Sequence, residues 1–420
     1  MKNSNTKKLG KLGNKALLVT VDIGKLKHTG YCRSRDGRDL TPFEFSNTTE
    51  GFFMFWKRVF KIKSSWDLKD MVIGFESTGP YAEPLLHFLN KRGVRLVQVN
   101  PMHTKKIKEL CDNSPAKTDW KDPRVIADII ELGHGLTVVI PEKETAELRR
   151  LTQARERSVQ RRSVLFSQLH DLVFLIFPEF LSIMDDLTTK SAKHLLNNYP
   201  RPKDIVDQGE ERLGQTLKAV SRGRIKGERA RKLYLAAKES AGIKEGEESI
   251  VFEMGAIISM IEAIDTLICE FEERVGKYLE RVPYSRFILS IKGIAKITTA
   301  GIIGEMGGFR HFRTISEVQK HAGLNLYEIS SGKHKGEKHI TKRGRSLLRK
   351  LLFLASINVV RKDGIMHKQY QLHLQKGMPK IKALIAISRK LLALIFALVR
   401  DQNDYLEDYA KTNHQFKQAA

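Results

Sequence analysis

The sequence predicts a mixed α/β domain at the N-terminus, a long helical arm in the middle and a helix-rich region at the C-terminus. Three short apolar segments come first, and strands then alternate with helices, which is the pattern of a mixed sheet. Farther along, apolar residues recur at helical spacing over two long stretches. A chain of 420 residues exceeds the size at which one hydrophobic core usually stops growing, so we expect several domains.

The strands of the expected sheet are short apolar runs. They lie at residues 17–22, 28–33, 42–45, 71–76 and 94–99. A helix is expected at 48–61, because Phe52 and Phe55 belong to a set of apolar residues at helical spacing. Another helix is expected at 84–92. The first three strands form a meander and the later ones alternate with helices, so the sheet is expected to be mixed.

Two long helices are expected in the middle of the chain, at 142–177 and 250–279. Their apolar faces favour pairing as a coiled-coil arm. The segment between them, 181–248, is polar and interrupted by glycines, and it includes the basic run at 222–226. We expect helices with a mobile basic loop there rather than a compact core. The expected domains are a basic tail at 1–15, the sheet domain at 16–141, the helical arm with a basic insertion at 142–282 and a C-terminal domain with a helical tail at 283–420.

The charge balance favours a polyanionic partner. There are 73 Lys and Arg against 48 Asp and Glu, a formal net charge of +25, which suits nucleic acid or an anionic membrane. The most apolar run, 391–399, is too short to span a bilayer and has basic flanks, so we expect no membrane partner. The three widely spaced cysteines indicate neither a disulfide framework nor a structural zinc site, and the N-terminus does not resemble a signal peptide. A cytoplasmic protein is expected.

Four acids are candidate metal ligands. Asp22 and Glu76 end two expected strands, while Asp119 and Asp122 begin an expected helix at an i, i+3 spacing that puts them on one face. Such a cluster repels itself unless a cation neutralises it, and carboxylate oxygens suit Mg²⁺ or Mn²⁺. Two such ions can hold the attacking and leaving oxygens of a phosphodiester. Turn and helix caps explain each acid singly, so the pattern alone leaves both explanations open.

A basic loop precedes the apolar helix near residue 347. Between Ser331 and Lys350 there are eight Lys or Arg and one acid, Glu337, which suits contact with phosphates. A serine in this setting can attack phosphorus, because nearby cations stabilise both the alkoxide and the developing oxyanion. A flexible Ser-Gly turn in a solvated loop explains the same residues. Upstream, residues 289–295 join two helical patterns through Gly293 and resemble a helix-hairpin-helix, which holds phosphate on backbone N–H groups.

Several segments together resemble the successive motifs of DEDD transposases of the insertion sequence one-ten family, which are related to the Piv invertases. The matching segments are 19–24, 76–81, 99–101, 117–122 and, for the C-terminal transposase domain of the family, 294–354. The Lys-Thr-Asp-x-Lys-Asp block at 117–122 is the most specific. Two positions depart from the family pattern: Pro123 stands where Ala is common, and Leu326 stands where the Gly-Leu-x-Pro motif has proline.

The resemblance implies a RuvC-like, RNase H-type fold for the sheet domain, with Asp22, Glu76, Asp119 and Asp122 as a metal-binding tetrad. It implies that Ser331 is the nucleophile, with Ser330 as the alternative if the register shifts by one. The implied reaction is excision and integration of an insertion sequence by Mg²⁺-dependent phosphoryl transfer. The implied partners are donor and target DNA, a structured noncoding RNA and further copies of the chain, as a dimer or tetramer.

The residues expected to contact nucleic-acid phosphates form two basic clusters, with one lysine in the hairpin between them. They are Arg149, Arg150, Arg155, Arg157, Arg161, Arg162, Lys292, Lys333, Lys335, Lys338, Lys342, Arg343 and Arg345. Three rival functions stay open. They are a metal-dependent nuclease without a covalent serine step, a non-catalytic nucleic-acid-binding protein, and an actin-like ATPase or kinase, whose phosphate loop resembles the segment from Asp22 to Gly30.

Overall fold

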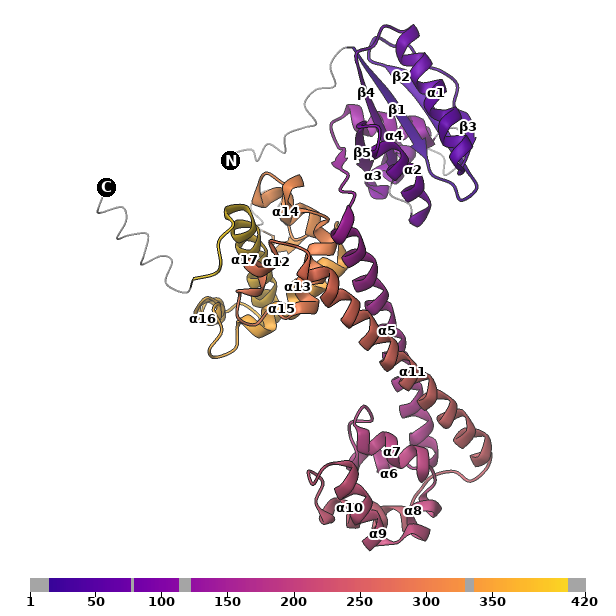
Figure 1. Ribbon diagram of the computed structural model, residues 1–420, viewed down its shortest axis with the longest axis vertical. Coiled ribbons are helices and arrows are strands. Elements are labelled where there is room, and N and C mark those ends of the chain that lie inside the picture. The colour runs from indigo at the N-terminus through magenta and orange to yellow at the C-terminus, as the bar shows by residue number, and fades with distance from the viewer. Residues whose placement is uncertain (1–14, 77–78, 113–121, 329–335, 407–420) are drawn as a thin grey trace, which may run out of the picture. The chain divides into compact units, whose positions relative to one another are not determined.

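The computed structural model describes residues 15–76, 79–112, 122–328 and 336–406 (Figure 1). The chain divides into two compact units, Met1–Ile140 and Pro141–Ala420. Within the described residues, we find no helix with both the length and the apolar character needed to cross a bilayer.

The first unit contains a six-stranded sheet in the order β3-β2-β1-β4-β5-β6. Strand β1 runs parallel to β4, and β4 runs parallel to β5, whereas the other neighbours are antiparallel. The strands are β1 (Ala16–Asp22), β2 (Lys27–Ser34), β3 (Phe43–Ser46), β4 (Asp70–Glu76), β5 (Arg95–Val99) and β6 (Leu136–Thr137). The expected mixed α/β architecture is confirmed. Strand β6 was not expected, because a strand of two residues is too short to produce a recognisable pattern in the sequence.

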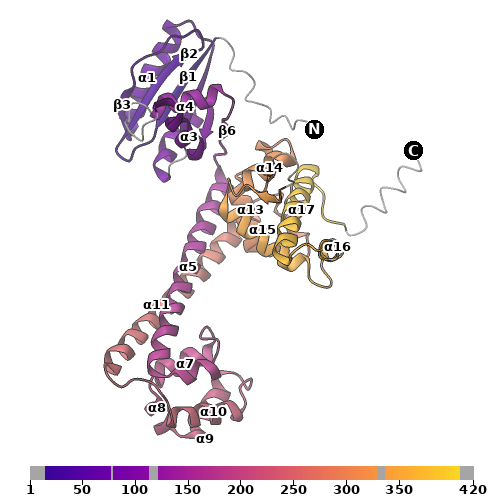
Figure 2. The same cartoon turned by 180° about the vertical axis from the view of Figure 1, so that it is seen from behind.

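Helices cover both faces of this sheet (Figures 1 and 2). On one face, side chains of α1 (Thr49–Ser65) and α2 (Glu83–Asn90) pack against alternate residues of β1 such as Val19. On the other face, α4 (Asp122–Glu131) packs against the intervening residues, such as Leu18. Helix α3 (Pro101–Asp112) contacts α4, and the 3₁₀ turn η1 (Pro80–Ala82) leads into α2. Because β1 is buried on both faces, its residues before Asp22 are apolar except for Thr20.

In the second unit, two long helices lie side by side (Figures 1 and 2). They are α5 (Lys143–Ile176) and α11 (Glu247–Glu280), which matches the two long helices expected from the sequence. Heptad packing between them stays a prediction. Five short helices connect them: α6 (Pro178–Ile183), α7 (Lys190–Asn198), α8 (Pro202–Gln208), α9 (Glu210–Val220) and α10 (Gly227–Lys238).

The short helices enclose a hydrophobic core, so the expectation that this segment lacks a compact core is wrong. The mobility of the basic loop stays a prediction. Phe180, Leu195, Leu213 and Leu233 are all buried in one cluster with the ends of the two long helices. Each of these helices is only a few turns long, so each contributes one to three buried apolar residues. A periodic pattern therefore does not build up along the sequence, although the residues meet in space.

The C-terminal helices form a second core with the other ends of α5 and α11. The elements are α12 (Ser285–Leu289), α13 (Lys296–Met306), η2 (Phe309–His311), α14 (Ile315–Ala322), β7 (Leu326–Glu328), β8 (Lys338–Ile340), α15 (Ser346–Val359), α16 (His367–Gln375) and α17 (Lys380–Asp401). Leu391 and Ile395 of the apolar run are fully buried in this core. A glycine with φ +104, Gly293, turns the chain between α12 and α13, and the helix-hairpin-helix interpretation of this turn stays a prediction.

Helices α5 and α13 approach so closely that their backbones touch at Gly304. A Cβ atom at this position would lie 2.6 Å from the amide nitrogen of Arg149 and 2.8 Å from its Cα. The obstacle is backbone rather than a movable side chain. Only glycine therefore permits the observed distance between the two helices.

We predict that Gly304→Ala lowers the free energy of unfolding by about 1–3 kcal/mol, because the added methyl group forces the two helices apart. Chemical denaturation of the second unit, monitored by circular dichroism, measures the effect. Gly255→Ala is the matched control: it lies in α11, and its Cβ would meet nothing within 4 Å. The control should be neutral or slightly stabilising. Equal behaviour of the two variants would contradict the close-approach argument.

Candidate active site

Asp22 and Glu76 lie side by side at the edge of the sheet where β1 and β4 end. The parallel register pairs Val21 with Phe75, so each acid is the next residue on its strand. Residues two apart on a strand face the same side of the sheet. Both acids lie two residues beyond a position that faces α4, which on β1 is Thr20, so both acids belong to the face covered by α4. Both side chains are partly exposed.

The N-terminus of α4 lies over the same edge. The hydroxyl group of Thr20 donates a hydrogen bond to the carbonyl oxygen of Pro123, which places Asp122, the first residue of α4, beside the end of β1. Asp122 is only 6% exposed. Farther along α4, a Cβ atom at Gly74 would lie 2.0 Å from Cδ1 of Ile130, so the helix packs tightly over β4 as well.

Three of the four expected tetrad acids therefore gather on one face at one edge of the sheet, and Asp119 lies outside the described residues. Among the residues that are described, no three His, Cys, Asp or Glu side chains are arranged closely enough to hold a metal ion. The donor set is all carboxylate, which suits a hard divalent cation. The fold thus supplies ligands of the right chemistry at one edge, although their assembly into a tetrad stays a prediction.

The serine loop connects the two strands of an antiparallel hairpin. Tyr327 of β7 pairs with His339 of β8, and Glu328 pairs with Lys338. Ser330, Ser331, Lys333 and Lys335 lie outside the described residues.

Hydrogen bonds attach the base of the hairpin to the end of α14. The backbone N–H of Lys342 donates to the carbonyl of Gly323 at 3.0 Å, and that of Arg345 donates to the carbonyl of His321 at 2.9 Å. The guanidinium group of Arg349 donates to the carbonyls of Ala322 and Gly344, both at 3.0 Å. These bonds to main-chain carbonyls hold the segment that follows β8 against the end of α14.

A buried glutamate lies beneath this base. Glu305, near the end of α13, is 2% exposed. Its carboxylate accepts a hydrogen bond of 2.7 Å from the side chain of Gln153 and forms an ion pair of 3.5 Å with Arg345. The carbonyl of Glu305 accepts from Arg149 at 3.0 Å and lies 3.0 Å from the ring nitrogen Nε2 of His321. This network connects α5, α13, α14 and the start of α15.

Burial lowers the pKa of two members of this network. The pKa of His321 is lowered to about 4, mainly by burial; the positive charges of Arg345 and Arg149 act in the same direction, and the hydrogen bond to Glu305 acts against them. The imidazole is therefore neutral near pH 7, and the carbonyl of Glu305 requires the proton on Nε2. Burial also lowers the pKa of Arg149 to about 9, with the charge of Arg345 acting in the same direction.

Arg149 is not available to nucleic acid, which corrects its assignment as a phosphate contact. It is 8% exposed, and its guanidinium group donates to the carbonyls of Gly304 and Glu305 at 2.8 and 3.0 Å. Its hydrogen bonds satisfy the last carbonyls of α13, which have no partner within the helix. The role of Arg149 is to join α5 to α13.

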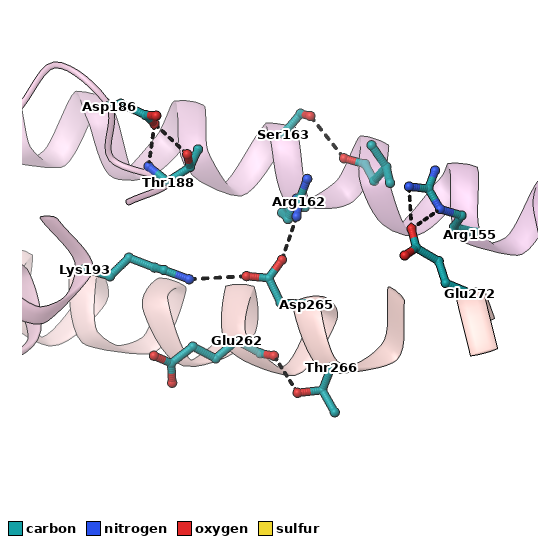
Figure 3. Close-up of polar contacts among 11 residues, drawn as sticks. Arg155, Arg162, Ser163, Asp186, Thr188, Lys193, Glu262, Asp265, Thr266 and Glu272 are labelled. Atoms are coloured by element: carbon teal, nitrogen blue, oxygen red, sulfur yellow. Dashed lines mark hydrogen bonds and ion pairs between the residues drawn. The ribbon is translucent and has the colours of Figure 1, made fainter. Parts of the chain in front are cut away.

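Two more arginines of α5 point toward α11 (Figure 3). Arg155 forms an ion pair with Glu272 at 2.6 Å, and Arg162 forms one with Asp265 at 2.7 Å. Lys193 shares Asp265 at 3.3 Å. These charges are therefore partly neutralised within the arm.

The other basic residues of the expected contact set are mostly at the surface. Those with exposed side chains are Arg150, Arg157, Arg161, Lys292, Lys338, Lys342 and Arg343. Arg157 and Arg161 line a shallow, largely apolar hollow between α5 and α11. Arg345 is partly buried because of its ion pair with Glu305. Pattern reading missed Glu305 itself, although an acid inside the otherwise apolar α13 was a signal that could have found it.

Two segments of the chain match family models of known proteins. Residues 19–178 match a family model described as "Transposase", and residues 285–371 match one described as "Transposase IS116/IS110/IS902 family". The chain is 23% identical to the "Insertion element IS116 uncharacterized 44.8 kDa protein" of Streptomyces clavuligerus, over 91% of this chain and 94% of the relative. It is 22% identical to the "Insertion element IS110 uncharacterized 43.6 kDa protein" of Streptomyces coelicolor, over 93% of this chain and 95% of the relative.

These matches identify the chain as a transposase, an enzyme that recombines DNA. It belongs to the IS110 family. The family resemblance drawn from the sequence motifs is confirmed.

We predict that His321 makes the protein less stable in acid. Its pKa in the folded state, about 4, lies below its ordinary value of 6.5, so the unfolded chain binds the proton more readily. The free energy of unfolding should be constant above about pH 7.5 and fall as the pH drops through 6.5, by up to about 3 kcal/mol at pH 4.

Urea unfolding at a series of pH values measures this effect as the difference between the wild type and His321→Gln, whose amide can still donate to the carbonyl of Glu305. The variant should lose part of the pH dependence. His170→Gln removes an exposed histidine as the control. If His321→Gln and the wild type lose stability in parallel as the pH falls, His321 does not cause the loss.

Proposed function

We propose that this transposase excises and integrates an insertion sequence by metal-dependent phosphoryl transfer through a serine-linked DNA intermediate. The observation that carries the proposal is the placement of Asp22, Glu76 and Asp122 at one edge of the sheet, on the face covered by α4. Carboxylate oxygens suit a cation that binds phosphate oxygens.

The order and direction of the strands support a RuvC-like, RNase H-type assignment for the first unit. An antiparallel meander of β1, β2 and β3 is joined to the parallel strands β4 and β5, with helices on both faces. In this arrangement Asp22, Glu76 and Asp122, together with Asp119, would hold Mg²⁺ or Mn²⁺. The bound metal would polarise the scissile phosphodiester.

The serine supplies the covalent step. The hydroxyl oxygen of Ser331 forms an ester bond with phosphorus as its proton departs, and the bond from phosphorus to one sugar oxygen breaks and releases a free hydroxyl group. A sugar hydroxyl of the second DNA strand then attacks the same phosphorus and releases the serine. The phosphodiester bond energy is conserved, and exposed cations such as Lys338, Lys342 and Arg343 are placed to stabilise the charge on phosphate.

The family resemblance adds two partners to the proposal. A structured noncoding RNA would bridge donor and target DNA, and the enzyme would act as a homo-oligomer, in which the tetrad and the serine act on the same phosphodiester. The excess of basic residues, +25 overall, supports the binding of more than one polyanion.

We predict that Asp122→Asn reduces recombination by about 100-fold or more, because it removes one negative ligand while keeping the size of the side chain. Recombination of a supercoiled donor with Mg²⁺ or Mn²⁺ measures the effect, and the melting temperature tests the fold. Asp70→Asn, at the opposite end of β4 and exposed, is the control and should keep full activity. Near-normal recombination by Asp122→Asn would remove this residue from the tetrad.

We predict that Ser331→Ala keeps DNA binding but loses the covalent protein–DNA adduct and recombination, because the cations of the hairpin remain and the nucleophile is gone. Denaturing gels of reactions with labelled DNA reveal the adduct. If Ser330→Ala loses the adduct and Ser331→Ala does not, the nucleophile is Ser330. If neither variant loses recombination, the serine step is wrong and the enzyme cleaves DNA at the metal site alone.

A further inference from the structure

Helices α9 and α10 and the turn between them, residues 221–226, form a helical hairpin that we call the α9–α10 hairpin. It belongs to the compact group of short helices that connects α5 to α11 along the chain (Figure 1). One family match ends at residue 178 and the other begins at residue 285, so the hairpin lies outside both. Its role is therefore not assigned by family membership.

The hairpin concentrates positive charge. From Arg212 to Lys238 there are nine Lys or Arg and a single acid, Glu228. All nine basic side chains are exposed; they are Arg212, Lys218, Arg222, Arg224, Lys226, Arg229, Arg231, Lys232 and Lys238. Glu228 is already engaged, because it forms an ion pair of 3.0 Å with Lys232 one turn away. The surface therefore carries an uncompensated positive field.

The contrast with α5 shows that these cations do not serve the fold. On α5, Arg155 and Arg162 face acids of α11 and form ion pairs (Figure 3). Within the part of the chain that the structure describes, Arg222, Arg224 and Lys226 form no ion pair. Like charges packed this densely repel one another and destabilise the folded chain, so a polyanionic partner is their natural counterpart.

Hydrogen bonds define the backbone path of the turn that carries these cations. Arg222 and Gly223 both take positive φ, +54° and +78°. The N–H of Gly223 donates to the carbonyl of Lys218 at 2.8 Å, and the N–H of Ile225 donates to the hydroxyl of Ser221 at 3.0 Å.

The side chain of Ile225 packs against the core of the short helices, so the turn is anchored from below. Cations on an ordered turn lose less conformational entropy when they bind than cations on a mobile loop.

The chemistry of the surface favours the backbone of a double helix. A platform for single strands needs exposed aromatic side chains on which bases stack. The hairpin has one aromatic residue, Tyr234, which packs against the core and lies under Lys238 at 4.7 Å. The turn offers only arginine and lysine, which bind phosphates without reading sequence. DNA is the polyanion on which this family acts.

The hollow between the two helices is a poorer candidate than the turn. Glu210 and Glu211 line it together with Glu228, so its field is mixed. The turn, with Arg222, Arg224 and Lys226, has no acid among its six residues. The binding surface is therefore the exposed turn and the adjoining first turn of α10.

We propose that the α9–α10 hairpin binds the sugar–phosphate backbone of duplex DNA at a second site, away from the serine hairpin. Both sites belong to the second unit, and α5 joins them: Arg149 contacts α13 near one end, while the carbonyl of Leu175 accepts from Ile243 near the other. Between these residues α5 extends for roughly 40 Å. A second attachment raises the effective concentration of DNA at the first.

The test compares two triple variants of the full-length protein that lose the same charge. Arg222→Asn, Arg224→Gln and Lys226→Gln together neutralise the turn, and asparagine tolerates the positive φ of residue 222. The matched control neutralises three exposed lysines elsewhere among the short helices and their loops. These are Lys190→Gln, Lys203→Gln and Lys244→Gln.

The measurement is fluorescence anisotropy with a duplex DNA of about 30 base pairs and unrelated sequence, from about 50 to 200 mM salt. The turn variant should reduce the slope of log affinity against log salt by about 2 to 3, and the control by less than 1. Equal reductions in the two variants, or none in either, would overturn the proposal. A reduction seen with an RNA duplex but not with DNA would also overturn it, because the surface would then bind RNA.

Two further measurements keep the result interpretable. Circular dichroism and the melting temperature should match the wild type for both variants, because every replaced side chain is exposed. Arg224→Glu, a single charge reversal, should weaken DNA binding at least as much per residue as neutralisation does; unchanged binding would contradict the proposal. Since the readout is equilibrium binding, failure of the serine mechanism leaves this test unaffected.

Discussion

Arg149 crosses from α5 to α13 and donates to the carbonyls of Gly304 and Glu305, and much of the second unit depends on this contact. The two backbones touch at Gly304, so the guanidinium group reaches the last carbonyls of α13, which have no partner within the helix. The carboxylate of Glu305 lies in the same place and pairs with Arg345. One buried charge network therefore sets the relation between the long arm and the helices that carry the serine hairpin.

A network of this kind is costly to form and costly to break. Burying charged groups requires that each be paired, and removing one partner of a buried pair typically destabilises a protein by about 3–5 kcal/mol. The network also includes the neutral His321, whose proton is committed to the carbonyl of Glu305. The serine hairpin consequently rests on a base with one preferred arrangement, which is the condition that the proposed nucleophilic role of the serine would require.

The many positive charges of this transposase divide into two groups. Some, such as Arg149, Arg155 and Arg162, are used to hold helices together. Others, such as Arg222, Arg224 and Lys226 of the α9–α10 hairpin, are exposed and form no ion pair with any described residue. Net charge alone does not separate these groups, because a pair formed across two helices depends on which residues face each other. The free cations, rather than the total, define where a polyanion can bind.

The amino-acid sequence by itself determined the mixed sheet, the two long helices and the ends of the strands at Asp22 and Glu76, because period-two and helical spacing are local properties of the chain. Motif order also determined the family. The sequence could not show that the short helices close a core, since each supplies too few apolar residues for a periodic signal. Nor could it show that Arg149 is buried: its spacing is that of a surface residue, and only the approach of α13 at Gly304 covers it. The tertiary structure decided which charges pair, because a pairing between residues more than a hundred positions apart leaves no trace in local sequence.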